Sequence, residues 1–294
     1  MRGALRRVAR QLAIVPVVAV ASYFLIAALP LGAEDESKRQ LPAELAASYR
    51  RDLGIGQPLG FLRPWQKLLR GERLGTSAQG VTGDELLRKL SGSIAVGSVA
   101  LALALLWALA FAAVRGRVRR HAWAVSDVVA AIAFGTPVFL PALVLAPYVA
   151  EAGHLLPEFS AALVISVWPG ILLGALVGDQ LRAELSKDYV RTALAKGLSR
   201  RGVLRRHVLP NALPALLDSI GPVATALLAG SFAAERVFGL PYFGQLYVLA
   251  VLQKQVAVVV VATTCFAALL AAVGLVVELA RVLVDPRART AGQS

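Results

Sequence analysis

Residue types that carry catalysis or bind metals are few in this chain and widely separated. The sequence has three histidines and one cysteine among 294 residues, and all three histidines fall in predicted connections between apolar segments. No H-E-x-x-H or C-x-x-C pattern occurs, and no G-x-x-x-x-G-K-[ST] sequence is present to cradle the phosphates of a nucleotide. Hydrolysis inside a membrane needs a base or a metal ligand at membrane depth. We therefore expect a non-catalytic chain that itself binds no metal or cofactor.

Clustered cations are the second kind of chemistry in the sequence. Residues 182–210, hereafter the basic loop, carry eight Lys and Arg side chains between Arg182 and Arg206 and lie between two apolar segments. Such a run can hold a soluble partner, or it can lie on anionic lipid as a basic amphipathic helix. We interpret the basic loop as a docking element for a soluble partner, and a helix resting on lipid is the alternative.

Local signals predict a helix, a turn and a second helix within the basic loop. Gly197 suits the left-handed position at a helix C-terminus, and Ser199 can cap a following helix that ends before Pro210. A repeat of four residues predicts an apolar stripe on the first helix. The stripe is made of Val190, Leu194 and Leu198.

The composition excludes an ordinary water-soluble domain. Hydrophobic residues make up 57% of the chain and charged residues 17%, as expected for a protein that lives in a membrane. Uncharged runs of roughly 18 residues or more, the length that a helix needs to cross a bilayer core, occur five times, and a weaker sixth run contains Asp218. Each span must be helical because lipid leaves backbone groups no other partner. We predict an all-α membrane protein with six transmembrane helices.

The distribution of cations predicts which side of the membrane each connection faces. Arginines crowd before the first span and after the second, and such crowding marks the cytoplasmic side. Both termini and the basic loop then face the cytoplasm, and the net charge of +13 is explained by membrane orientation without a nucleic-acid partner. The N-terminal apolar run exceeds the core of a signal peptide, about 7 to 15 residues, so we expect a retained anchor and not a cleaved signal.

These spans and this orientation predict the organisation of the whole chain. The long outer connections are either surfaces for an external protein or caps over helix ends. The predicted segments are a cytoplasmic N-terminus (1–11), spans over 12–33, 91–114, 128–150, 159–181, 211–234 and 255–284, an extracytoplasmic loop domain between the first two spans (34–90), the cytoplasmic basic loop (182–210), an extracytoplasmic re-entrant segment (235–254) and a cytoplasmic tail (285–294).

Ionisable residues inside spans are costly and are therefore candidate sites. Asp218 and Glu235 bracket the fifth span, and together with Gly221 they are candidates to line a polar path. Ordinary charges near helix ends are the alternative. Asp127 and Asp179 lie at predicted cytoplasmic helix ends near other arginines, so for them we favour the structural interpretation.

One motif in the basic loop resembles a known family. Arg191-Thr-Ala-Leu-Ala-Lys-Gly197, followed after nine residues by His207-Val-Leu-Pro210, is similar to the cytoplasmic EAA loop of ABC importer permeases. The likeness is greatest to the oligopeptide, dipeptide and nickel branch, whose loops resemble Asp-Tyr-Val-Arg-Thr-Ala-Arg-Ala-Lys-Gly-Leu, and this chain differs there at Leu194. Other similar stretches lie at 51–59, 74–77, 235–244 and 285–287. In a departure from the family, Pro30-Leu-Gly-Ala33 replaces its usual Pro-Gly-Asp-Pro element.

The resemblance implies a permease subunit in the bacterial cytoplasmic (inner) membrane that works with partners. These are a second permease, two ABC ATPase subunits that bind ATP and Mg²⁺, and an extracytoplasmic solute-binding protein. Closure of the ATPases would drag the basic loop and alternate access between the two faces. The loop residues implied in this coupling are Val190, Arg191, Thr192, Ala193, Leu194, Lys196, Gly197, Leu198 and Pro210, and the candidates for the translocation path are Asp218, Gly221 and Glu235.

The substrate class follows less directly from the residues. A single methionine, one cysteine and three scattered histidines could not form a relay of soft ligands for free nickel. We therefore expect peptides, with nickel or another small solute as the alternative. A secondary transporter driven by an ion gradient is a further alternative, but we find neither the inverted repeat nor the midplane charges typical of that class.

Overall fold

The computed structural model describes residues 2–28, 51, 53–54, 59–75, 80–117, 123–152 and 156–284, and in these residues the chain forms helices joined by turns. An isolated antiparallel bridge joins Leu74 to Val81. The parts of the expected outer loop domain at 34–50, 52, 55–58 and 76–79, the Pro30–Ala33 departure and the expected tail lie outside the described residues. The predicted all-α class is confirmed for the part of the chain that the structure describes.

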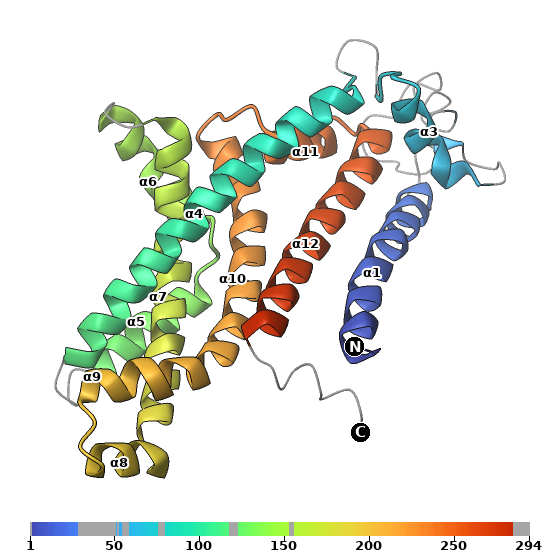
Figure 1. Cartoon of the computed structure of the whole chain (residues 1–294). Coiled ribbons are helices and arrows are strands. Elements are labelled where there is room, and N and C mark those ends of the chain that lie inside the picture. The colour runs from blue at the N-terminus through green and yellow to red at the C-terminus, as the bar shows by residue number, and fades with distance from the viewer. Residues whose placement is uncertain are drawn as a thin grey trace. The chain divides into compact units, whose positions relative to one another are not determined.

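Long apolar helices dominate the described residues. Five of these helices are long and apolar enough to cross a bilayer, and a bent pair, α5 and α6, makes a sixth span if its two halves are counted together (Figure 1). The number of six spans stays a prediction. The five helices are α1 (Arg2–Ala27), α4 (Gly83–Arg117), α7 (Pro157–Leu185), α10 (Leu209–Val237) and α12 (Val256–Val284).

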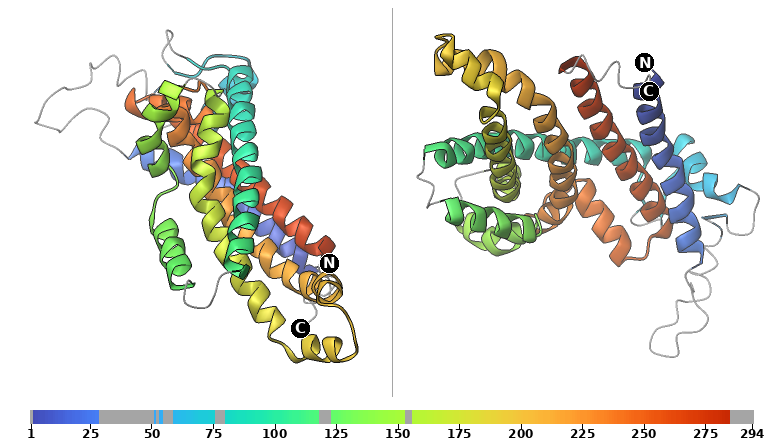
Figure 2. Two further views of the ribbon diagram at one scale, coloured as in Figure 1. Left: turned by 90° about the vertical axis from the view of Figure 1, so that its left-hand side faces the viewer. Right: turned by 90° about the horizontal axis from the view of Figure 1, so that it is seen from below.

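The third expected span, 128–150, is not one straight helix. It consists of α5 (Trp123–Gly135) and α6 (Leu140–Ala152), which meet at a bend of 96° and are seen as two separate helices in Figure 2. Pro137 causes the break because it lacks an N–H and disfavours a helical conformation in the residue before it. Thr136 donates its hydroxyl to the carbonyl of Ile132 at 2.6 Å, so one of the freed carbonyls has a partner.

The chain divides into two compact units, one formed by Met1–Arg6, Ile94–Leu240 and Val273–Ser294 and the other by Arg7–Ser93 and Pro241–Ala272. In the first unit, α7 packs against α10, α5 and α6. The second unit contains η1 (Gly60–Leu62), α3 (Arg63–Leu69) and α11 (Phe243–Leu252). There the backbone N–H of Phe243 donates to the buried hydroxyl of Ser93 at 3.0 Å, which ties the start of α11 to α4.

Glycines on α7 let α4 approach closely within the first unit. A Cβ built on Gly170 would lie 2.8 Å from the carbonyl oxygen of Ala104, and one on Gly174 would lie 2.7 Å from that of Ala108. Small residues spaced by four allow such contact between membrane helices. This close packing against α4 holds α7, the helix that leads into the basic loop.

Candidate functional site

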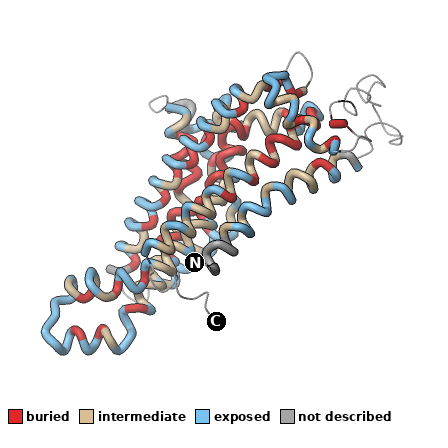
Figure 3. The backbone as a smooth tube through the Cα atoms, turned by 45° about the vertical axis from the view of Figure 1, so that its right-hand side comes forward, coloured by how far each residue is buried: buried red, intermediate tan, exposed pale blue. Residues whose placement is uncertain are grey.

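The basic loop is a helical hairpin at the end of α7. A short turn at Ser186 and Lys187 separates α7 from α8 (Asp188–Ala195), which is followed by α9 (Arg200–Val203) and a π-helical turn, η3 (Leu204–Val208), that leads into α10 (Figure 1). Most of its residues are exposed, with a few buried positions in each helix (Figure 3). The predicted helix, turn and helix are therefore present.

Gly197 ends α8 in the left-handed conformation, as predicted. Its φ is +84°, and its N–H donates to the carbonyl of Leu194 at 3.0 Å while the N–H of Leu198 donates to that of Ala193 at 3.3 Å. These two bonds form a Schellman motif, which satisfies the last carbonyls of a helix and reverses the chain. A Cβ at Gly197 would meet nothing within 4 Å, so the requirement for glycine is conformational and not steric.

Ser199 caps the second helix, but that helix does not end before Pro210. The Ser199 hydroxyl accepts the N–H of Gly202 at 3.2 Å, which confirms the predicted cap. The expected end is wrong: η3 continues from α9, the N–H of Leu209 donates to the carbonyl of Leu204, and Pro210 stands in the first turn of α10. Pro210 has no N–H to donate within a helix, and the wider π turn accommodates this missing bond, so α9, η3 and α10 form one continuous helical arm.

A small hydrophobic core holds the hairpin together. We call it the loop core, and it is formed by Val190, Ala193, Val203 and Val208, with Leu181, Tyr189 and Leu204 packed against it. The expected stripe is wrong in part, because Leu194 and Leu198 are each 38% exposed and Ala193 takes the inward position. Val190 and Ala193 are three residues apart and share a face, while Leu198 follows the reversal at Gly197 and no longer belongs to α8.

Glu184 is a buried carboxylate that the sequence reasoning missed. Only 2% of this residue is exposed. Lys187 Nζ donates to one carboxylate oxygen at 2.6 Å, and the Tyr189 hydroxyl donates to the other at 2.9 Å. Burial raises the pKa of the Tyr189 phenol, so the hydroxyl keeps its proton and donates at neutral pH. The sequence does contain a signal for this cluster: an acid, a base and a tyrosine, Glu184, Lys187 and Tyr189, lie within six residues at the start of the basic loop.

The outer face of the hairpin is cationic. Arg191 lies 4.0 Å from Asp188, and both side chains are largely exposed, so this pair contributes little to stability. Thr192 is exposed and donates its hydroxyl back to the carbonyl of Asp188 at 3.1 Å. The other exposed cations that follow α8 in the hairpin are Lys196, Arg200, Arg201, Arg205 and Arg206. The loop core therefore turns inward, and positive charge faces outward.

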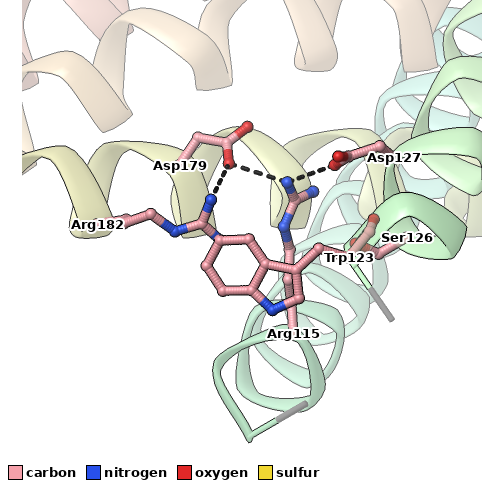
Figure 4. A network of polar contacts seen from close by, with 6 residues as sticks. All are labelled: Arg115, Trp123, Ser126, Asp127, Asp179 and Arg182. Atoms are coloured by element: carbon pink, nitrogen blue, oxygen red, sulfur yellow. Dashed lines mark hydrogen bonds and ion pairs between the residues drawn. The ribbon is translucent and has the colours of Figure 1, made fainter. Parts of the chain in front are cut away.

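A second charged cluster lies where α4, α5 and α7 meet (Figure 4). Arg115 on α4 is 5% exposed, and its guanidinium lies 2.6 Å from Asp127 on α5 and 2.9 Å from Asp179 on α7. Arg182 approaches Asp179 at 3.7 Å and stacks on the ring of Trp123. The sequence placed Arg115 in a loop as an orienting cation, whereas the structure makes it the bridge between two carboxylates that would otherwise repel each other.

Two of the three candidates for a polar path, Asp218 and Gly221, lie about one turn apart on α10, and Glu235 lies near the C-terminal end of that helix. Asp218 is half-exposed and pairs with Arg281 of α12 at 3.1 Å, whereas Glu235 is fully buried. Seventeen residues of helix separate them, which is about 26 Å along the axis. Gly221 faces Val277 of α12, whose Cγ1 would lie 3.6 Å from a Cβ at that position. The structure therefore places Asp218 and Gly221 together beside α12 and leaves Glu235 apart from them.

A cavity of about 510 Å³ lies between α5, α7 and α10, and Asp218 is one of its lining residues. Its walls are mainly apolar and include Phe134 from the last turn of α5 and Trp168 from α7. Thr136 and Ser219 add hydroxyl groups. Glu235 and Gly221 are not among its lining residues, so Asp218 is the one candidate path residue that this cavity contains.

The described residues offer no metal centre. Among them, no three His, Cys, Asp or Glu side chains are grouped where they could hold an ion. Of the three histidines, His207 lies in the described residues, half-buried in η3. What the geometry offers is a preformed cationic hairpin with its own core, joined through two long helices to an apolar cavity.

The chain is similar in sequence to known proteins. Residues 100–290 match the family described as the binding-protein-dependent transport system inner membrane component, which is more than half of the chain. A protein of Brucella ovis named as a peptide permease is 31% identical over 278 residues, covering 83% of this chain and 84% of that protein.

Two shorter matches are to dipeptide transport system permease proteins. The one from Lactococcus lactis is 35% identical over 127 residues, or 43% of this chain and 42% of that protein. The one from Bacillus subtilis is 32% identical over 123 residues, or 42% of this chain and 40% of that protein. The matched part of this chain thus spans about two fifths of the length of these two relatives.

Proposed function

Because the chain belongs to the family of inner membrane components of binding-protein-dependent transport systems, we propose that it is the permease subunit of an ATP-driven importer of peptides. The relatives named as dipeptide and peptide permeases support the substrate class. The observation that carries the proposal is the hairpin of the basic loop. It buries its own apolar residues in the loop core and presents cations outward, as suits a soluble acidic partner better than the acyl region of a membrane.

The proposed topology has six spans and places both termini in the cytoplasm of a bacterium, with the chain in the inner membrane. The five long helices and the bent pair supply the spans. The cations of the basic loop and the cluster at Arg115 support one orientation, because positive charge gathers at the cytoplasmic ends of membrane helices. The connections after α1 and after α10 then face outward, where a solute-binding protein would deliver its cargo.

The proposed partners follow from the family and from what this sequence lacks. The chain has no G-x-x-x-x-G-K-[ST] motif, so nucleotide and Mg²⁺ would be bound by two ATPase subunits. A second permease would complete the translocation path, and an extracytoplasmic solute-binding protein would supply the peptide. In this scheme the chain itself is non-catalytic and binds no cofactor.

Coupling would take place at α8. The helix is short and ends at the Schellman turn of Gly197. After that turn come α9 and η3, which run without a break into α10. A cleft of the ATPase that closes on α8 would therefore pull on α7 from one side and on α10 from the other. Both helices line the apolar cavity, so the same movement would reshape the proposed path beside Asp218.

The proposal is tested by transport in a reconstituted system. The chain is purified with its co-expressed second permease and ATPases, placed in liposomes, and supplied with the solute-binding protein and a radiolabelled dipeptide. We expect uptake that needs internal ATP and persists when ionophores collapse the ion gradients. Uptake that follows an ion gradient without ATP would instead identify a secondary transporter. ATP-driven uptake of Ni²⁺ and not of peptides would keep the permease assignment and overturn the substrate class.

A further inference from the structure

Glu184 makes two polar contacts across the turn between α7 and α8, with Lys187 and Tyr189. The coupling scheme does not by itself require them. Glu184 lies in the last turn of α7 and Tyr189 in the first turn of α8. Between them Lys187 adopts an extended conformation, with φ −72° and ψ 150°. The direction of α8 relative to α7 therefore depends on very few backbone torsions, and a turn of this kind would bend under load unless side chains brace it.

The carboxylate of Glu184 supplies that brace. Each of its oxygens accepts a hydrogen bond from a residue that follows α7. Lys187 donates to one oxygen at 2.6 Å, and Tyr189 donates to the other at 2.9 Å. The two bonds reach the turn and α8 respectively, so rotation about the turn breaks at least one of them. Charge-assisted bonds of this length are stronger than bonds between neutral groups.

The two partners of Glu184 contribute unequally. The Lys187 side chain is 56% exposed, so water competes for its ammonium group and weakens the pair. The Tyr189 ring packs against the loop core, which shields its hydroxyl. The hydrogen bond from the Tyr189 hydroxyl to Glu184 thus joins α8 to α7.

Stability alone does not explain a buried carboxylate at this position. Burying a charge costs free energy that an apolar residue of similar size would avoid, and the loop core already holds α8 against α9 and η3. What the polar pair adds is a fixed direction, because hydrogen bonds are directional and apolar contacts are not.

From this geometry we infer that Glu184 and Tyr189 are positioning residues that fix the direction of α8, so that movement of the ATPase is passed to α7 and not lost in the turn. This inference rests on the proposed function, since it takes α8 as the element that the ATPase grips. A hydrogen bond to a charged group is strong enough that its loss shifts the balance between the braced and the unbraced direction by about tenfold or more.

The decisive variant is Tyr189→Phe, which keeps the ring in the loop core and removes only the hydroxyl. The matched control is Tyr148→Phe, which removes an exposed hydroxyl on α6. Both are made in the complete complex of permeases and ATPases in nanodiscs. Three quantities are measured: the amount of ATPase that co-purifies, the basal ATPase rate, and the ratio of peptide taken up to ATP hydrolysed in the matching liposomes.

For Tyr189→Phe we expect normal co-purification, a basal rate within about twofold of the unmodified complex, and a loss of about tenfold in peptide moved per ATP. Tyr148→Phe should change none of these. Glu184→Gln keeps an acceptor for the Tyr189 hydroxyl but removes the charge, so its loss of coupling should be intermediate, whereas Glu184→Ala should lose as much as Tyr189→Phe. If Glu184→Ala does not accumulate in the membrane, the phenylalanine variant still decides the question.

The direction of α8 is followed independently with a probe on Thr192. The single cysteine, Cys265, is replaced by serine, and Thr192→Cys is labelled with a nitroxide or with a benzophenone. Nitroxide mobility should rise in Tyr189→Phe, because the bond that fixes the direction of α8 is lost. A purely structural role of Tyr189 in the loop core would leave the mobility unchanged. Unchanged mobility together with an unchanged ratio of transport to hydrolysis would overturn the inference.

The same probe separates this inference from the proposed function. Irradiation of the benzophenone in the unmodified complex should crosslink α8 to an ATPase subunit. If no crosslink to an ATPase forms, the docking proposal fails and the inference fails with it. If the crosslink forms but Tyr189→Phe couples normally, the docking proposal stands and the positioning role is rejected.

Discussion

Replacing Gly197 with a residue that has a side chain should weaken coupling by an amount that the backbone geometry sets. The left-handed conformation at φ +84° costs an ordinary L-residue about 1 to 2 kcal/mol. A Cβ would meet nothing within 4 Å, so no steric clash adds to that cost. A shift of this size raises the population of an opened turn about 5- to 30-fold. Gly197→Asn should cost less than Gly197→Ala, because asparagine tolerates this conformation.

The assay compares the ATPase rate stimulated by the solute-binding protein with the basal rate in liposomes. We expect Gly197→Ala to lower the stimulated rate severalfold and Gly197→Trp to abolish stimulation, because a bulky side chain on the open side of the turn would also obstruct an ATPase cleft. The matched control is Gly71→Ala, since Gly71 has φ +74° and likewise nothing within 4 Å but lies outside the basic loop.

The ranking of the Gly197 variants tests whether backbone strain at this position causes the loss of coupling. Conformational strain alone ranks asparagine as milder than alanine, whereas a pure space requirement ranks the variants by side-chain volume. Normal uptake by both Gly197→Ala and Gly197→Trp, with protein present in the membrane, would refute the assignment of α8 as the docking helix. A loss of coupling in Gly71→Ala as large as in Gly197→Ala would show that the effect is not specific to the basic loop.

Three further outcomes are expected. Arg115→Met should lower the midpoint of thermal unfolding in detergent by the equivalent of about 1 to 2 kcal/mol. This is less than for a fully buried pair, because both carboxylates are more than half exposed. The midpoint of Arg115→Lys should lie between those of Arg115→Met and the unmodified protein, and an unchanged midpoint in Arg115→Met would show that the bridge does not stabilise the fold. Gly174→Leu should cost about 1 to 3 kcal/mol by forcing α4 away from α7, while Gly135→Leu, whose Cβ meets nothing within 4 Å, should cost less. The raised pKa of Tyr189 means that its contribution is complete below the ordinary phenol pKa of about 10 and is lost as the pH rises through the higher folded value. Nitroxide mobility at position 192 should therefore stay constant from neutral to mildly alkaline pH and rise only above that point, and a rise near neutral pH would contradict this.

Local signals were sufficient for the caps of the basic loop. Gly197 and Ser199 act on backbone groups within five residues of themselves, and their conformational preferences do not depend on the rest of the molecule. The apolar runs likewise predicted membrane helices, because the length and composition of a segment decide whether it can cross a bilayer. The motif in the basic loop likewise indicates its family, because it is a run of residues that are neighbours along the chain.

Contacts between distant segments could not be obtained in this way. Arg115 and Asp179 are 64 residues apart, and only the packing of α4 on α7 through Gly174 brings them together. The periodicity of α8 suggested Leu194 as an inward residue, but the position of η3 decides that Ala193 faces the loop core. The bend between α5 and α6 also depends on context, since proline within a membrane helix is often accommodated without a sharp break.

The sequence by itself determined the apolar helices, the cationic character of the basic loop and the turn at Gly197, because each depends on residues that are neighbours along the chain. The tertiary structure alone decided that Glu184 is buried beneath Tyr189, that Arg115 bridges two carboxylates and that α10 continues unbroken from the hairpin. The physical reason is that burial and pairing of charge depend on which helices pack together, and that packing is a property of the whole fold and not of any segment.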